Sequence, residues 1–146
     1  MNRIMHVSEA EDLWDKKRHP NFAAREFACP CCGEFYWDSD YFDMAQKIRT
    51  LLGRSVKFNS AHRCGIHNAR VGGAPKSQHK KIALDFSLTS PAVTAEELPR
   101  IYDIMVSAGA RTFGLYRTFI HIDQRVGRFW ICPGGDKWEA YFRRYK

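Results

Sequence analysis

The alternation of apolar and polar residues in two short segments, 82–88 and 118–124, restricts the fold more than any other feature of the chain. In the first segment apolar residues occupy every second position, and Asp85 is the only carboxylate between them. In the second segment His121 and Asp123 share one face, opposite two isoleucines. Because successive side chains of a strand point to opposite faces, this period of two predicts two strands, each with a potential ligand opposite its aliphatic residues.

Helices are predicted on either side of the first strand. Residues 38–52 place apolar side chains at helical spacing and are followed by Gly53, which is typical of a helix end. A second helix is predicted after Thr94, because Glu97 stands at the spacing of a capping box. Pro99 favours a start somewhat later than Thr94.

The order of these elements predicts the fold class. Two more short strands are predicted at 56–59 and 111–116. The series helix, strand, loop, strand, helix, strand, strand indicates an α+β fold with a mainly antiparallel sheet flanked by helices. The chain has 146 residues and no internal repeat or low-complexity linker, so we predict a single domain, 1–146, whose core spans about residues 22–130.

A long segment, 60–81, separates the 56–59 strand from the strand that carries Asp85. It is rich in Gly, Ala, Asn, His and Ser, and it has at most one helical turn, near 67–69. Loops of this length are uncommon in a compact domain unless they are functional. We therefore expect functional residues within it.

A candidate zinc site follows from three residues. His79 lies near the end of this segment, six residues before Asp85, and His121 lies on the later strand. Two histidines and one carboxylate can hold a catalytic zinc and leave its fourth tetrahedral position for water. A zinc-bound water and a polarised carbonyl are what amide hydrolysis needs. Spacing alone leaves open that these histidines are structural.

A resemblance to a known family is carried by four runs of residues: FNSAHRC at 58–64, HNARVGGAPKSQH at 67–79, ALD at 83–85 and FIHID at 119–123. They resemble the zinc D-alanyl-D-alanine carboxypeptidase family, which includes VanY-like enzymes and phage endolysins and shares its fold with the hedgehog signalling domain. The resemblance extends over most of the chain.

The resemblance implies a hedgehog/DD-peptidase-like fold and roles for individual residues. His79, Asp85 and His121 match the family's ligands for one catalytic Zn²⁺. Arg63 matches an arginine that binds substrate or stabilises developing negative charge, a role that suits a guanidinium with two parallel donors. The implied substrate is the stem peptide of bacterial peptidoglycan. D-Ala-D-Ala carboxypeptidase, cross-link endopeptidase and L-Ala-D-Glu cleavage remain alternatives.

Two departures from the family pattern affect the site. The interval between His79 and Asp85 is one residue shorter than in the family and lacks the glycine that commonly follows the histidine. Thr118 stands where many relatives have a glutamate three residues before the last histidine. Asp123 is then the nearest candidate for a general base, and its alternative role is to orient His121.

The five cysteines allow a second metal site. An odd number of cysteines argues against a complete disulfide framework. Cys29 and Cys32 have the spacing of half a zinc knuckle, and Cys64 with Cys132 would complete a structural zinc site. We favour the alternative, reduced thiols or one disulfide, because the chain has no second CxxC pair.

Charge and hydropathy restrict the partners. The formal net charge of +7 favours polyanions such as the bacterial envelope, whereas the chain lacks the patterns of a specific nucleic-acid module. No apolar run is long enough to cross a bilayer, and the N-terminus lacks the apolar region of a signal peptide. We therefore expect a protein made in the cytoplasm that acts on the cell wall after release or is carried in a virion.

The sequence thus predicts a zinc peptidase of peptidoglycan, either a phage-type endolysin or a virion-associated lysin. The oligomeric state, monomer or virion-associated, is left open. One alternative is a non-catalytic structural or wall-binding domain with the same fold. A weaker alternative is nucleic-acid binding through the basic surface.

Overall fold

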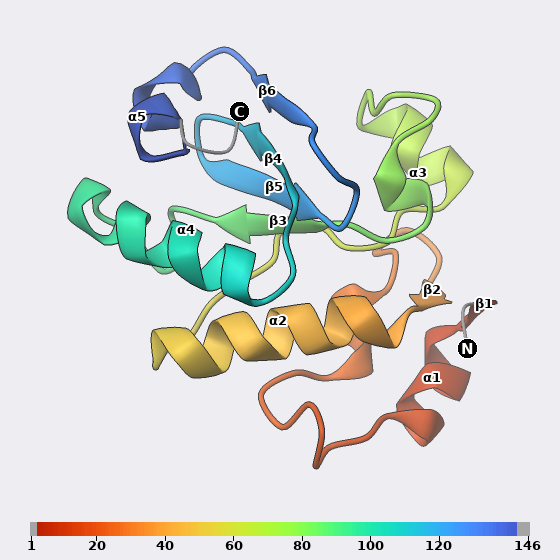
Figure 1. Ribbon diagram of the computed structural model, residues 1–146. Helices are drawn as coiled ribbons and strands as arrows, with labels where there is room; N and C mark the ends of the chain where they lie inside the picture. Colours follow the sequence, from red (N-terminus) through yellow and green to blue (C-terminus); the bar gives the residue numbers. More distant parts are fainter. Residues whose placement is uncertain (1–2, 143–146) are drawn as a thin grey trace. The chain divides into compact units, whose positions relative to one another are not determined.

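The computed structural model describes residues 3–142, and its helices and strands are labelled in Figure 1. The chain divides into two compact units. Among the described residues, the first unit comprises residues 3–46 and 60–84, and the second comprises residues 47–59 and 85–142. The predicted α+β class with mostly antiparallel strand pairing is confirmed. The single domain over 1–146 stays a prediction.

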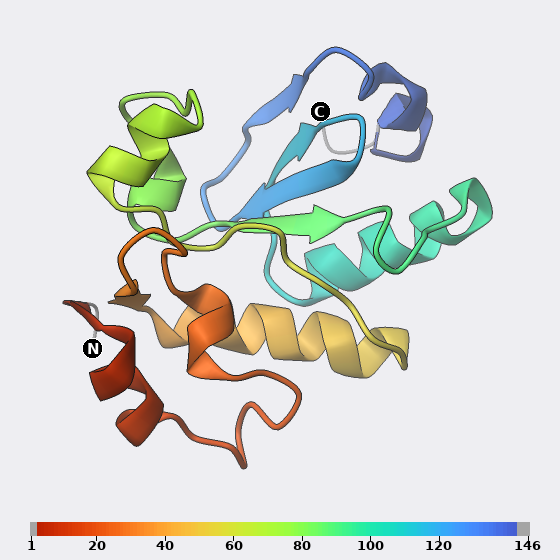
Figure 2. The ribbon, with the colours of Figure 1, turned by 180° about the vertical axis from the view of Figure 1, so that it is seen from behind.

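The first unit contains a two-stranded antiparallel sheet and several short helices (Figure 2). In this sheet β1 pairs with β2, with Ile4 opposite Tyr36. The elements of the unit, in chain order, are β1 (Arg3–His6), α1 (Val7–Leu13), η1 (Ala24–Phe27), β2 (Glu34–Trp37), the start of α2 (Ser39–Leu52), α3 (Gly65–Arg70) and η2 (Gln78–Lys80).

An aromatic cluster forms the core of the first unit. The Trp14 ring lies 5.0 Å from the Phe42 ring and 5.6 Å from the Phe27 ring, measured between ring centroids. Its indole N–H donates to the carbonyl of Phe22, 3.0 Å away. Phe27 and Phe42 are both fully buried. Aromatic pairs of this kind add to the stabilisation that comes from burying their apolar area.

The second unit contains a four-stranded sheet in the order β3-β5-β4-β6. Strands β4 and β5 are antiparallel, and they place Gly114 opposite His121. Strand β6 is parallel to β4. The strands are β3 (Leu84–Ser87), β4 (Thr112–Leu115), β5 (Phe119–Asp123) and β6 (Phe129–Ile131).

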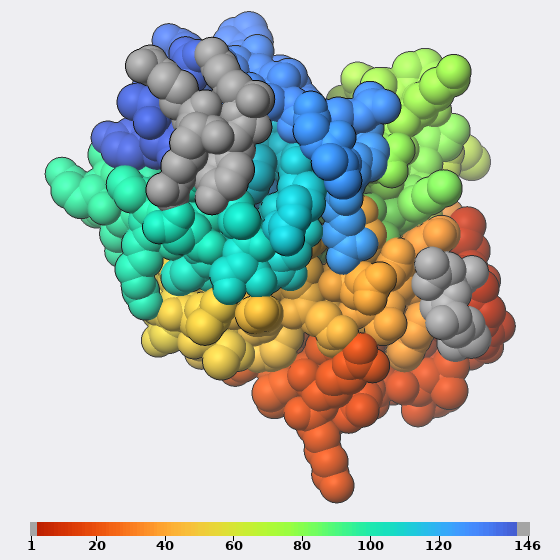
Figure 3. Space-filling view, in the orientation of Figure 1, coloured from red at the N-terminus to blue at the C-terminus, as the bar shows by residue number. Residues whose placement is uncertain are grey.

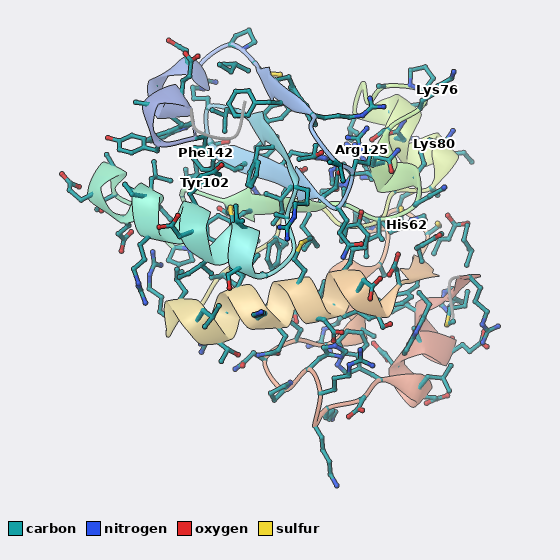
Figure 4. The ribbon with its side chains drawn as sticks, in the orientation of Figure 1. His62, Lys76, Lys80, Tyr102, Arg125 and Phe142 are labelled. Atoms are coloured by element: carbon teal, nitrogen blue, oxygen red, sulfur yellow. The ribbon has the colours of Figure 1, made fainter. Side chains whose placement is uncertain are left out.

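Helices α4 (Leu98–Ser107) and α5 (Glu139–Phe142) contribute aromatic residues to the core of the second unit. Figure 1 shows α4 running beside the sheet. Tyr102 and Phe142, labelled in Figure 4, have ring centroids 4.6 Å apart, and both rings contact Phe113 of β4. The short helices η3 (Ala95–Glu97) and η4 (Asp136–Trp138) precede α4 and α5.

Most of the predicted elements are confirmed. The helix at 38–52 is α2, and the strands predicted at 82–88, 111–116 and 118–124 are β3, β4 and β5. The helix after Thr94 starts with η3 and continues as α4, with Pro99 in its first turn, where a missing N–H costs little. Within residues 3–142, no helix combines the length and the apolar character needed to span a membrane.

The strand predicted at 56–59 is wrong. Only Phe58 forms a bridge, with Phe86 of β3. The backbone makes two hydrogen bonds there, from Asn59 N–H to the carbonyl of Asp85 and from Ser87 N–H to that of Lys57. The alternation of Val56 to Asn59 therefore corresponds to an extended segment that touches the sheet at one point.

We predict that Phe142→Ala lowers the free energy of unfolding by about 3–5 kcal/mol, because it leaves a cavity beside Tyr102 and Phe113. Urea unfolding followed by circular dichroism measures the loss. Val126→Ala is the matched control, since Val126 is 83 % exposed. Equal stability of the two variants would contradict the place of α5 in this core.

Candidate metal centre

Strands β3 and β5 position a carboxylate and an imidazole against each other in the second unit. Asp85 lies on β3 and His121 on β5, neighbouring strands of the sheet. The Asp85 Oδ1 and His121 Nδ1 atoms are 3.2 Å apart. Both residues are buried, at 7 % and 6 % exposed. Buried polar groups need hydrogen-bond partners, and Asp85 and His121 serve as partners for each other inside the sheet.

Asp123 fixes the opposite side of the His121 ring. Its Oδ2 lies 2.7 Å from His121 Nε2, and both of its oxygens accept from the guanidinium of Arg125, which is labelled in Figure 4. Burial of Asp123 by itself favours the neutral acid, but the hydrogen bonds from His121 and Arg125 outweigh it and lower the pKa of Asp123 to about 2. Asp123 is therefore a carboxylate at all ordinary pH values.

The two carboxylates also act on His121. Burial alone lowers the pKa of His121, because it disfavours the charged ring. The hydrogen bonds to Asp123 and Asp85 act in the opposite direction and are stronger, so the pKa of His121 is raised above its ordinary value. The surroundings of this imidazole thus favour a positive charge.

Trp130 lies against the His121 ring, a contact that no local sequence pattern predicts. The two ring centroids are 5.1 Å apart. Gly114, opposite His121 on β4, makes this possible, because a Cβ atom at Gly114 would lie only 2.4 Å from the indole of Trp130. The indole N–H donates to Tyr116 Oη at 3.1 Å, which holds the ring in place. One side of the imidazole is therefore shielded by an apolar wall.

His79 lies in the first unit, on η2, and its ring is held by the chain around it. Its Nδ1 lies 2.7 Å from the carbonyl of Ala61, so Nδ1 carries the proton and Nε2 is the nitrogen suited to a metal. The backbone N–H of His79 donates to Ser77 Oγ. His79 is only 3 % exposed. A histidine whose Nδ1–H is held by a carbonyl is the usual arrangement of a metal ligand.

The ligand atoms of His79, Asp85 and His121 lie within 4.8 Å of one another. Two imidazoles and one carboxylate are a suitable donor set for zinc with one position left open. The hydrogen bonds of the two imidazoles are also those expected of metal ligands, because Ala61 orients His79 and Asp123 orients His121.

Arg63 lies in the same segment as His79, and two hydrogen bonds join it to residues 77–79. The backbone N–H of Arg63 donates to the carbonyl of His79 at 2.6 Å. Its Nη2 donates to Ser77 Oγ at 3.0 Å, and the same hydroxyl accepts from the N–H of His79. Among residues 3–142, the buried Nε atom of Arg63 has no hydrogen-bond partner.

His62, the neighbour of Arg63, has a structural role. Its Nε2 lies 2.7 Å from a carboxylate oxygen of Glu34, and its Nδ1 contacts the carbonyl of Lys81. With both ring nitrogens occupied, His62 connects β2 to the end of the long segment. Its position is labelled in Figure 4.

The predicted cysteine set has to be corrected in one member. The sulfur atoms that come together are those of Cys29, Cys31, Cys32 and Cys64. Cys132 belongs to the second unit, where its backbone N–H donates to the carbonyl of Leu115. The CxxC spacing pointed to two of the right residues but missed Cys31, because a template of paired cysteines leaves out the middle one.

The buried residues His79, Asp85 and His121 are thus a group of two histidines and one carboxylate that could hold a metal ion. A comparison with protein families matches residues 20–123 to the peptidase M15 family. Because the match covers most of the chain, the protein belongs to this family of peptidases. Comparisons with curated proteins and with solved structures gave no significant match.

We predict that Gly114→Ala destabilises the protein by about 1–3 kcal/mol, because the added methyl group must displace the Trp130 indole or the strand. Chemical denaturation measures the change. Gly65→Ala serves as the control, since a Cβ atom there meets nothing within 4 Å. Wild-type stability of Gly114→Ala would show that Trp130 does not lie against this glycine.

Proposed function

We propose that the protein is a zinc-dependent peptidase that hydrolyses peptide bonds in the stem peptides of bacterial peptidoglycan. One observation carries the proposal: a member of the peptidase M15 family brings the ligand atoms of His79, Asp85 and His121 within 4.8 Å of one another. A non-catalytic domain with the same fold has no need to keep all three ligands together with the groups that orient them.

Each ligand offers a definite atom to the metal. His79 would bind through Nε2, because Ala61 holds its Nδ1. His121 would bind through Nδ1, which faces Asp85, because Asp123 holds its Nε2. Zinc, when bound, lowers the pKa of a water ligand and polarises the scissile carbonyl. The protein contributes the fixed ligand positions and the indole that shields the imidazole of His121 from water.

Asp123 acts as a positioning residue in this proposal. Its carboxylate is bound by His121 and by Arg125, and its pKa of about 2 makes it a weak base at neutral pH. A general base works best when its pKa is near the operating pH. The geometry therefore supports the role in which Asp123 orients His121 over the role in which it activates water.

Arg63 is proposed to bind the substrate. Its backbone and its Nη2 are tied to the segment that carries His79, so the guanidinium is held by the same hydrogen bonds as a metal ligand. A guanidinium that is held in this way suits a substrate carboxylate or the oxyanion that develops during hydrolysis. Stem peptides end in a carboxylate and carry others along their length, and either could be the group that is bound.

The net charge of +7 is consistent with adhesion to an anionic cell wall. We accordingly propose a lysin of the phage type, either an endolysin or a virion-associated enzyme. Mass analysis of fragments from digested, purified peptidoglycan identifies the bond. Loss of a terminal D-alanine indicates a carboxypeptidase, loss of cross-links indicates a cross-link endopeptidase, and release of peptides that begin with D-Glu indicates L-Ala-D-Glu cleavage. An undigested wall with zinc fully bound would favour a non-catalytic wall-binding domain.

We predict that His79→Ala, Asp85→Ala and His121→Ala each remove one zinc per chain and abolish hydrolysis of peptidoglycan, because each deletes a ligand. Elemental analysis and a turbidity assay on purified walls measure the two effects. His67→Ala, a histidine of the same segment outside the ligand group, is the control. Lysis by any of the three ligand variants would refute the proposed centre.

We predict that Asp123→Asn weakens zinc binding by about 10–100-fold, the usual effect of losing the partner that orients a ligand. Excess zinc should then restore most of kcat. Asp136→Asn, which alters an exposed aspartate of the same unit, controls for the loss of charge. A variant with full zinc occupancy and a kcat that stays low would instead assign Asp123 as the base.

A further inference from the structure

Four cysteines of the first unit form a cluster that the proposed reaction does not use. The sulfur atoms of Cys29, Cys31, Cys32 and Cys64 lie within 4.8 Å of one another, and all four residues are free thiols. We propose that these cysteines form a second, structural zinc site with four thiolate ligands. This inference does not depend on the proposed peptidase activity.

The geometry of the cluster suits a tetrahedral ion. Four sulfurs that each lie about 2.3 Å from a zinc ion are about 3.8 Å from one another, which falls within the observed limit. Four thiolates close the coordination sphere and leave no position for water, which is the mark of a structural site. The cluster therefore differs in kind from the centre of His79, Asp85 and His121.

Three of the ligands come from one tight loop, CPCCG at 29–33. The N–H of Gly33 donates to the carbonyl of Cys29 at 2.9 Å, and the N–H of Cys29 donates to the carbonyl of Glu34 at 2.7 Å. Gly33 has a φ of +74°, a conformation that residues with side chains rarely adopt. This backbone turn brings the three thiols to one point just before β2 begins.

The fourth ligand, Cys64, lies at the start of α3. Its Sγ accepts a hydrogen bond from the backbone N–H of His67 at 3.3 Å. Nη1 of Arg70, at the end of the same helix, lies 3.9 Å from Cys31 Sγ. A zinc ion with four thiolates carries a net charge of −2, so a backbone donor and a guanidinium beside the sulfurs are stabilising partners.

A disulfide is the alternative explanation for neighbouring sulfurs. One disulfide accounts for two of the four cysteines and gives no reason for the other two to converge on the same point. Cys29 is buried and Cys64 only 9 % exposed, whereas Cys31 and Cys32 are exposed. The cluster thus has a buried and an exposed side, which gives an ion a route of entry.

A zinc ion here would anchor the long segment 60–81. Cys64 directly follows Arg63, and the loop at 29–33 directly precedes β2. Ile66 and Val71 are exposed, so burial of these apolar side chains does not stabilise the segment. Figure 3 shows much of the segment, in green, at the molecular surface. A metal cross-link at Cys64 would supply the missing constraint beside the proposed substrate-binding arginine.

Cobalt substitution tests the site directly. Purified, reduced protein loaded with Co²⁺ should show the sulfur-to-cobalt charge-transfer absorption in the near ultraviolet that only thiolate ligands give. The centre of two histidines and a carboxylate cannot produce this absorption, so the result is separate from the fate of the proposed peptidase. Absence of the absorption in the loaded, reduced wild-type protein would overturn the inference.

Variants identify the ligands. Cys31→Ser and Cys32→Ser alter exposed residues, so the chain should still fold, and each should lower the zinc content by one ion per chain and weaken the cobalt absorption. Cys132→Ser, which lies outside the cluster, should change neither. Retention of all zinc by Cys31→Ser and Cys32→Ser would exclude the four-thiolate site, as would an intact mass that shows a disulfide among these cysteines in the metal-loaded protein.

Discussion

The antiparallel pairing of β4 with β5 is the constraint that fixes His121 and its surroundings in the second unit. It sets Gly114 opposite His121, and the missing side chain of that glycine leaves room for the Trp130 indole against the imidazole. A shift of one residue would turn His121 to the other face of the sheet, away from Asp85. Asp123 is two residues further along β5 and therefore lies on the same face as His121, where its carboxylate holds the imidazole.

Local periodicity explains how much could be predicted from the sequence. The strand that carries Asp85, the strand that carries His121 and the helix at 38–52 each repeat with a clear period, and a short window of residues defines them. Strand β6 is three residues long and pairs with β4 in parallel, so no local pattern reveals it. The aromatic cluster around Trp14 comes from loops and short helices, and only the folded chain shows which of its rings meet.

The candidate site likewise has a part that could be predicted from the sequence and a part that could not. Residue type and family resemblance suggested His79, Asp85 and His121 as a group, and the structure brings their ligand atoms together. The wall formed by Trp130 could not be predicted, because it depends on the space left by a glycine on another strand. The cysteine group was predicted in three of its four members, and Cys31 was missed for a related reason. Pairing by spacing considers positions along the chain, whereas the turn at Gly33 lets three neighbouring thiols face one point.

The segment 60–81 has to present Arg63 and His79 precisely although it has little apolar surface to bury. The positions of these two side chains must therefore be fixed by polar contacts, which involve only a few atoms. Ser77 Oγ accepts hydrogen bonds from both Arg63 and His79, and the Ala61 carbonyl holds the His79 ring. Hydrogen bonds of this kind contribute only about 1 kcal/mol each, so such a segment gains most from a few strong tethers. One metal bound near the end of the segment through His79 and another bound near its start through Cys64 would be two such strong contacts. The first metal must keep a coordination position open for water, whereas the second must have none.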